Sequence, residues 1–207
     1  MNLRMATKFL IIGSAYTLFY KAVFAIFPFI TNNILVSKLL SLLWIMATIT
    51  IILFAYYFPK EVFPLNKRIK ISLQLVILFT CLIILLQLPF GQSLVPGMHK
   101  NVIFEFIRFL NSISMFVFWI SFYKILSHNN SLQLSLKLVI WTASFGLFLE
   151  LIQFYYYINF LFTGSESIPF APLQYFAAII FVLSYCAVIN FLLKFRKVED
   201  YSELLLK

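Results

Sequence analysis

Four ionisable side chains lie inside long apolar segments of the sequence, namely Lys21, Glu105, Arg108 and Glu150. A charge at the centre of a bilayer costs about 2.5–3.5 kcal/mol on insertion scales, so each of these residues needs a partner or a function. Glu105 and Arg108 stand at positions i and i+3, which share one helix face, as do Glu150 and Gln153. Two acids and two bases balance in charge, and they suit either an ion-pair network or a site for a ligand, an ion or a proton.

Three interpretations of these residues stay open at this stage. The basic side chains can extend to the lipid headgroups, or the four charges can fix helix packing as a closed network. They can also line a cavity that opens to the outer face, with Asn111 continuing inward. Glu150 is the best single candidate, because apolar residues flank it and no basic residue lies within one helical turn. The candidate ligand or ion-pair residues are Lys21, Glu105, Arg108, Asn111, Glu150 and Gln153.

Residues for metal or nucleophilic chemistry are scarce. The chain has two histidines, His99 and His128, which the predicted topology places on opposite sides of the membrane. Cys81 and Cys186 each lie in an apolar stretch without a neighbouring histidine or a second cysteine. We therefore expect no metal, no cofactor and no assigned catalytic residue, and an enzyme is the least favoured class.

The elements that carry these residues are predicted to be membrane-spanning helices. Of 207 residues, 63% are hydrophobic and 11% are charged, whereas a soluble domain has about 25% charged residues. Apolar segments long enough to cross about 30 Å of hydrocarbon cover residues 9–30, 34–58, 71–90, 102–126, 132–162 and 173–195. We predict an all-α transmembrane bundle of six spans in one domain, residues 1–195, followed by a short cytoplasmic tail, residues 196–207.

The distribution of basic residues predicts the orientation of the bundle. With six spans, twelve Lys and Arg residues fall on the side of both termini, against only Lys38 and Lys100 near the opposite joins. Basic residues accumulate in cytoplasmic loops, so both termini are predicted to be cytoplasmic, in a bacterial inner membrane. The net charge of +9 then reflects topology, and we expect no nucleic acid partner.

Residues 148–154, Phe-Leu-Glu-Leu-Ile-Gln-Phe, resemble the Glu-x-x-Gln-Phe helix of the VanZ-like membrane proteins. An asparagine-containing span, residues 108–118, precedes them at a suitable distance. That family continues with an Asp-rich stretch, whereas residues 163–169 contain no aspartate and none follows until Asp200. The resemblance is therefore confined to these two segments, and the sequence does not assign the chain to the family.

Three functions of different classes follow from these features. The first is a non-enzymatic membrane subunit, scaffold or sensor that oligomerises, or that recruits a cytoplasmic protein or anionic lipid through its basic inner residues. Those docking candidates are Lys60, Lys67, Arg68, Lys70, Lys194, Arg196 and Lys197. The second is a small transporter or channel that binds a solute, a proton or a lipid headgroup at the outer polar residues. The third is an intramembrane enzyme acting on lipid or peptide, with Glu105 or Glu150 as base and Arg108 holding an anionic headgroup. The expected partners are membrane lipids and another copy of the chain or a second protein.

Overall fold

The structure is a computed structural model that describes residues 3–26, 34–62, 67–87, 98–126, 130–163 and 170–197, and all of these except Leu126 and Lys197 are helical. The six helices are α1 (Leu3–Ile26), α2 (Ile34–Val62), α3 (Lys67–Gln87), α5 (Met98–Ile125), α6 (Asn130–Thr163) and α7 (Phe170–Arg196). The predicted all-helical class and the order of six segments are confirmed. Of the predicted tail, residues 196–207, the structure describes Arg196 and Lys197, and the rest lies outside the described residues.

Five of these helices are long and apolar enough to cross a membrane. Within the described residues, the qualifying segments are Leu39–Lys60, Lys67–Gln87, Asn101–Ile125, Ser131–Thr163 and Phe176–Arg196. The remaining helix, α1, has 24 residues and is about 36 Å long at 1.5 Å per residue. Helices of this length and composition indicate a multi-pass membrane protein.

The helices extend beyond the predicted apolar segments at several ends. The helix α2 continues through Pro59 to Val62, and α3 begins at Lys67, so the expected join over residues 59–70 is shorter than predicted. Hydropathy marks the residues that meet hydrocarbon, whereas helical hydrogen bonds continue into the headgroup zone. Pro59 has no N–H to donate to the carbonyl of Ala55, so the helix continues to Val62 with one backbone hydrogen bond fewer.

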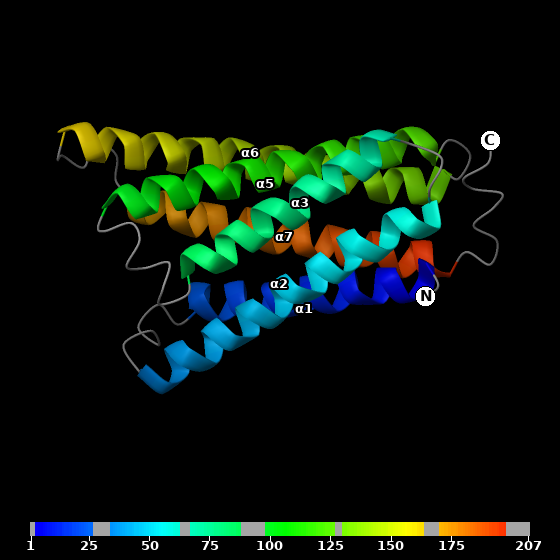
Figure 1. Cartoon of the computed structure of the whole chain (residues 1–207), viewed down its shortest axis with the longest axis horizontal. Helices are drawn as coiled ribbons and strands as arrows, with labels where there is room; N and C mark the ends of the chain where they lie inside the picture. Colours follow the sequence, from blue (N-terminus) through cyan, green and yellow to red (C-terminus); the bar gives the residue numbers. More distant parts are fainter. Residues whose placement is uncertain are drawn as a thin grey trace.

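The six helices form a closed ring. Each helix packs against the helices before and after it in the chain, and α7 packs against α1. Figure 1 shows the start of α1 and the end of α7 at the same end of the bundle, and α6, with 34 residues, projecting beyond the other helices at the opposite end. We call the end that holds the start of α1 and the end of α7 the basic end. It carries the exposed residues Lys60, Lys67, Arg68, Lys70, Lys194, Arg196 and Lys197.

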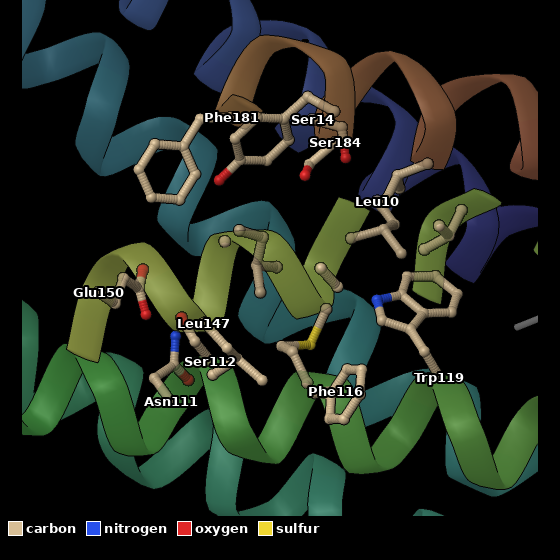
Figure 2. A pocket seen from close by; sticks show the side chains of 17 residues that line it. Leu10, Ser14, Asn111, Ser112, Phe116, Trp119, Leu147, Glu150, Phe181 and Ser184 are labelled. Carbon is tan, nitrogen blue, oxygen red and sulfur yellow. The ribbon is translucent and has the colours of Figure 1, made fainter. Parts of the chain in front are cut away.

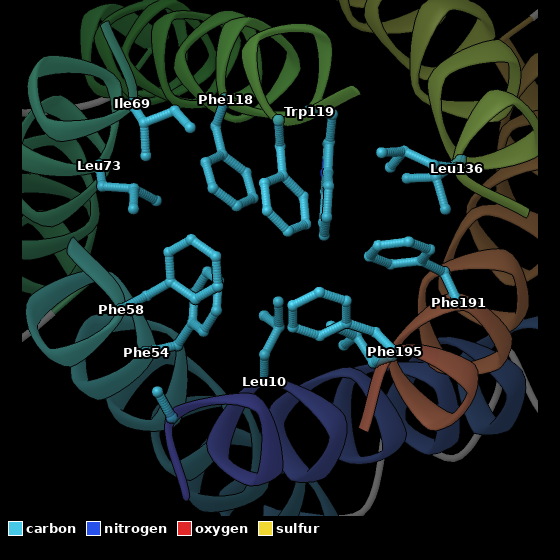
Figure 3. Close-up of a cluster of buried hydrophobic side chains, with 14 of the residues drawn as sticks. Leu10, Phe54, Phe58, Ile69, Leu73, Phe118, Trp119, Leu136, Phe191 and Phe195 are labelled. Carbon is cyan, nitrogen blue, oxygen red and sulfur yellow. The ribbon is translucent and has the colours of Figure 1, made fainter. Parts of the chain in front are cut away.

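An aromatic plug fills the centre of the ring toward the basic end (Figure 3). It consists of six phenylalanines that are each at most 1% exposed: Phe54, Phe58, Phe118, Phe122, Phe191 and Phe195. They come from α2, α5 and α7, which alternate around the ring. The ring of Phe122 lies 5.4 Å from Phe58, 5.7 Å from Phe118, 6.0 Å from Phe191 and 5.4 Å from Phe195, measured between centroids. The plug therefore joins three helices that do not neighbour one another.

The helices α1 and α2 approach closely at Gly13. A Cβ atom at this position would overlap the side chain of Thr50 and would lie 3.1 Å from the carbonyl oxygen of Ala47. On the same helix, Ser14 and Thr17 are buried. Small residues let membrane helices pack backbone against backbone, which explains the glycine at this crossing.

Candidate functional site

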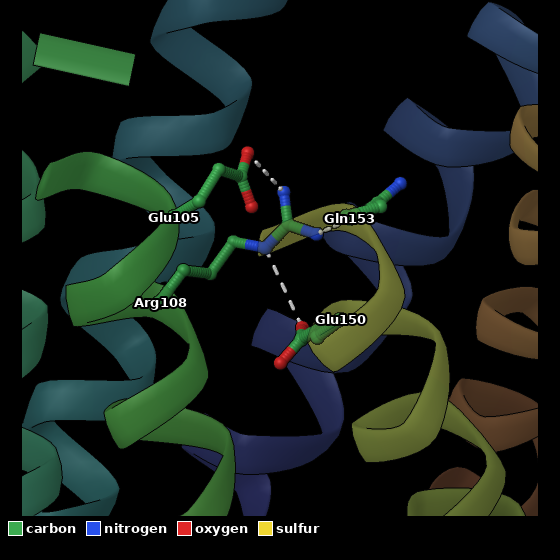
Figure 4. A network of polar contacts seen from close by, with 4 residues as sticks. All are labelled: Glu105, Arg108, Glu150 and Gln153. Atoms are coloured by element: carbon green, nitrogen blue, oxygen red, sulfur yellow. Dashed lines mark hydrogen bonds and ion pairs between the residues drawn. The ribbon is translucent and has the colours of Figure 1, made fainter. Parts of the chain in front are cut away.

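Arg108 lies between two carboxylates that belong to neighbouring helices. Its Nη1 atom is 3.1 Å from Glu105 Oε1 on the same helix, and its Nε atom is 3.4 Å from Glu150 Oε1 on α6. Its Nη2 atom donates a hydrogen bond of 2.5 Å to the Oε1 atom of Gln153, also on α6. Figure 4 shows the guanidinium group between the two glutamates, so the i, i+3 pair on α5 meets the i, i+3 pair on α6.

We call these four residues the ion cluster. Two carboxylates face one guanidinium, so the three charged side chains of Glu105, Arg108 and Glu150 carry a formal charge of −1. The two glutamates are buried, with side-chain exposures of 11% for Glu105 and 6% for Glu150. Removing such charges from water is costly unless they are paired and hydrogen-bonded, and the arginine supplies both kinds of contact.

The other two predicted residues, Asn111 and Lys21, lie on α5 and α1. Asn111 is one helical turn deeper than Arg108, and its Oδ1 atom accepts a hydrogen bond of 3.3 Å from Thr80 Oγ1 on α3. Lys21 belongs to α1. The main neighbours of α1 in the ring are α2 and α7, not α5 or α6. The side chain of Lys21 lies outside the described part of the structure.

A cavity of about 170 Å³ lies next to the ion cluster, inside the ring. Figure 2 shows Glu150 and Asn111 at one end of the cavity and Trp119 at the other. Glu150 lines this cavity and also contacts Arg108, so one carboxylate belongs to both features. The volume exceeds that of one water molecule several-fold and resembles the roughly 150 Å³ cavity that holds benzene in an engineered protein.

The cavity and the aromatic plug occupy different levels of the ring. Trp119 lines the apolar end of the cavity and its ring lies 4.7 Å from that of Phe118, a member of the plug. The plug thus begins where the cavity ends, on the side of the basic end.

Sequence reasoning missed the contribution of α7 to this cavity, and on α1 it named Lys21 and not Ser14. Ser184 and Tyr185 line it from α7, and Ser14 lines it from α1. The Oγ atom of Ser184 is buried without a hydrogen-bond partner among the described residues. A serine hydroxyl in an apolar helix usually donates a hydrogen bond to the backbone of its own helix, as Ser114 does to the carbonyl of Leu110 at 2.9 Å. A serine in such a segment therefore does not by itself indicate a binding site.

The predicted docking residues are all exposed at the basic end. The Nζ atom of Lys60 lies 3.8 Å from the centre of the Tyr56 ring, a cation–π contact. The Nζ atom of Lys194 donates a hydrogen bond of 2.9 Å to Ser135 Oγ on α6. Docking of a protein or of anionic lipid at this end stays a prediction.

Comparison with protein-family models, with curated proteins and with solved structures finds no match to this chain. The function is therefore argued from the geometry of the ring, the ion cluster and the cavity.

Proposed function

We propose that the protein binds a small ligand within the membrane, as a receptor or carrier, in the cavity beside Glu150. The observation that carries this proposal is that a buried carboxylate of the ion cluster also lines a cavity inside the ring. An ion cluster that only held helices together would need no cavity beside it, because close packing would serve that purpose better. A binding function also explains why a buried charge, which costs free energy inside a membrane, is present at this depth.

Binding is favoured over the two other classes. Hydrolysis of a lipid or peptide requires a base that reaches the substrate, and the described carboxylates share one arginine that holds them in place. A scaffold or sensor uses its outer surfaces and is compatible with any interior. A cavity lined mostly by apolar side chains with a few polar groups is typical of a small-molecule binding site.

We also propose the orientation in which the ring works. The excess of Lys and Arg at the basic end supports a cytoplasmic location for that end, and we place the six spans in a bacterial inner membrane. The cavity then lies in the outer half of the bilayer, and the aromatic plug separates it from the cytoplasm. A ligand would enter from the outer face or from the outer leaflet.

This orientation predicts the labelling of single cysteines by a membrane-impermeant maleimide in spheroplasts. After replacement of Cys81 and Cys186 by alanine, Asn101→Cys, at the start of α5, should react from outside. Lys70→Cys, exposed at the basic end, should react only after the membrane is permeabilised. The reverse pattern, or labelling of both from outside, would contradict the proposed topology.

The binding function predicts that a small molecule co-purifies with the protein and that filling the cavity expels it. Ala143 lines the cavity from α6, so Ala143→Leu places three further carbon atoms in it. Native mass spectrometry of protein in lipid nanodiscs should show a bound small molecule in the parent and most of it lost in the variant. The matched control is Phe145→Leu, which changes a 51% exposed side chain on the same helix and should keep the ligand.

Two results would contradict this proposal. One is a parent protein that carries no small molecule and binds none from a metabolite extract. The other is a ligand that Ala143→Leu retains as fully as Phe145→Leu does, because such a ligand would bind elsewhere on the protein.

A further inference from the structure

The cavity has two chemically different ends. At the end beside the ion cluster lie Glu150 from α6 and Asn111 and Ser112 from α5, which provide a carboxylate, an amide and a hydroxyl group. At the other end lie the apolar side chains of Leu10 and Trp119 (Figure 2). A ligand that fills such a cavity has a polar group at one end and an apolar group at the other.

The charge of the polar end selects the charge of the ligand. Among the described residues that line the cavity, Glu150 is the one with a charged side chain. Arg108 is not among them, and its Nη1, Nε and Nη2 atoms already contact Glu105, Glu150 and Gln153. An anionic ligand would have to approach a carboxylate and displace an existing partner from the guanidinium. A cationic ligand would instead be attracted to Glu150 in surroundings of low dielectric constant.

Aromatic rings add a second preference for a cation. Phe181 and Tyr185 line the cavity from α7, and Phe116 and Trp119 line it from α5. The faces of aromatic rings attract ammonium groups, most strongly where water is excluded. A carboxylate combined with several aromatic rings is a favourable environment for an organic cation.

The oxygen atoms around Glu150 distinguish between kinds of cation. A primary ammonium has three N–H donors, whereas a quaternary ammonium has none. Glu150 and Ser112 line the cavity with a carboxylate and a hydroxyl group, whose oxygens can accept hydrogen bonds from those donors. A metal cation would use the same oxygens, but it would leave the apolar end of the cavity without a function.

We infer that the cavity binds a small primary amine in its ammonium form, with the ammonium at Glu150 and the apolar part directed toward Trp119. The volume of about 170 Å³ suits a molecule on the order of six to ten non-hydrogen atoms, by comparison with benzene in its engineered cavity. This inference rests on the proposed binding function and names the class of ligand.

The first test uses the unmodified protein in nanodiscs of phosphatidylglycerol, a lipid without an amine. Hexylamine, hexanol and hexanoate have the same chain and differ in charge, and isothermal titration calorimetry measures the affinity of each. Hexylamine should bind at least about tenfold more tightly than either of the others, because it alone forms charge-assisted hydrogen bonds to Glu150. Equal or tighter binding of hexanol or hexanoate would overturn the inference.

The second test compares the two carboxylates of the ion cluster. Glu150→Gln should reduce the affinity for hexylamine at least about tenfold and leave the affinity for hexanol within about twofold. Glu105→Gln removes the other carboxylate that contacts Arg108 but does not line the cavity, so it is the matched control and should keep the preference for hexylamine. A preference that survives Glu150→Gln, or that both variants lose equally, would overturn the assignment of the ammonium to Glu150.

The outcomes separate this inference from the broader proposal. If hexanol matches hexylamine and Ala143→Leu abolishes both, the cavity binds ligands but is not an amine site. If no probe binds and no small molecule co-purifies, both statements are wrong. Repeating the titration with phosphatidylethanolamine in the nanodiscs distinguishes two sources of the amine. Competition by that lipid would identify a headgroup, and unchanged hexylamine binding would identify a free amine, and either result supports the ammonium site.

Discussion

Replacing Arg108 with methionine is expected to destabilise the protein by about 3–5 kcal/mol, the cost of leaving buried charges without their partner. The variant keeps a long apolar side chain but leaves the carboxylates of Glu105 and Glu150 facing each other, with exposures of 11% and 6%. The free energy of unfolding in mixed micelles, followed by circular dichroism during titration with dodecyl sulfate, measures the loss. We expect the α5–α6 contact to open first, because the guanidinium connects these two helices.

The control for Arg108→Met removes the two charges that the substitution leaves behind. The triple variant Arg108→Met, Glu105→Gln, Glu150→Gln has no charge in the ion cluster and should recover most of the lost stability. This recovery would show that uncompensated charge, and not the lost volume of the arginine, is the cause. A single variant within about 1 kcal/mol of the parent would mean that the ion cluster does not stabilise the bundle.

Truncating the hub of the aromatic plug should have the next largest effect. Phe122 is 1% exposed and touches four other phenylalanine rings. Phe122→Ala should cost about 2–4 kcal/mol, mostly as lost van der Waals contacts around a new cavity. This loss of stability is smaller than the loss for the same substitution in the core of a soluble protein, because a membrane helix that has separated from the bundle still faces apolar lipid. The same unfolding titration measures it.

The matched control for Phe122→Ala is Phe145→Ala on α6, where the side chain is 51% exposed. That change should cost less than about 0.5 kcal/mol, as for most exposed positions. If both alanine variants lost the same stability, the plug would contribute no more than an ordinary lipid-facing side chain. The two measurements together test whether close packing of the phenylalanines in the centre of the ring stabilises the protein.

The sequence predicts the six helices well, because each is a long apolar segment. It also predicts that the pairs Glu105–Arg108 and Glu150–Gln153 each share a helix face, because helical geometry fixes that relation. The contact between the two pairs was left open, since it depends on how α5 and α6 are rotated against each other. The structure supplies that rotation through the contacts of Arg108 with Glu150 and Gln153.

The inner and outer faces of the helices were not predictable by the same means. In a membrane both faces of a helix are apolar, so hydropathy does not distinguish a side chain that faces lipid from one that faces the core. The chain has 26 phenylalanines, and Phe122 and Phe145 each follow a serine in an apolar segment but have exposures of 1% and 51%. The plug and the cavity could therefore be found only once the helices were placed in the ring.

The order of the helices around the ring has a consequence for synthesis. The ion cluster joins α5 and α6, which follow each other in the chain, so its charges can pair as soon as this hairpin has emerged from the ribosome and entered the bilayer. The closing contact between α1 and α7 joins the first and last helices described and must wait until translation of α7 is finished. The α5–α6 hairpin can therefore enter lipid with its arginine already neutralised, while α1 keeps one side against lipid until α7 arrives.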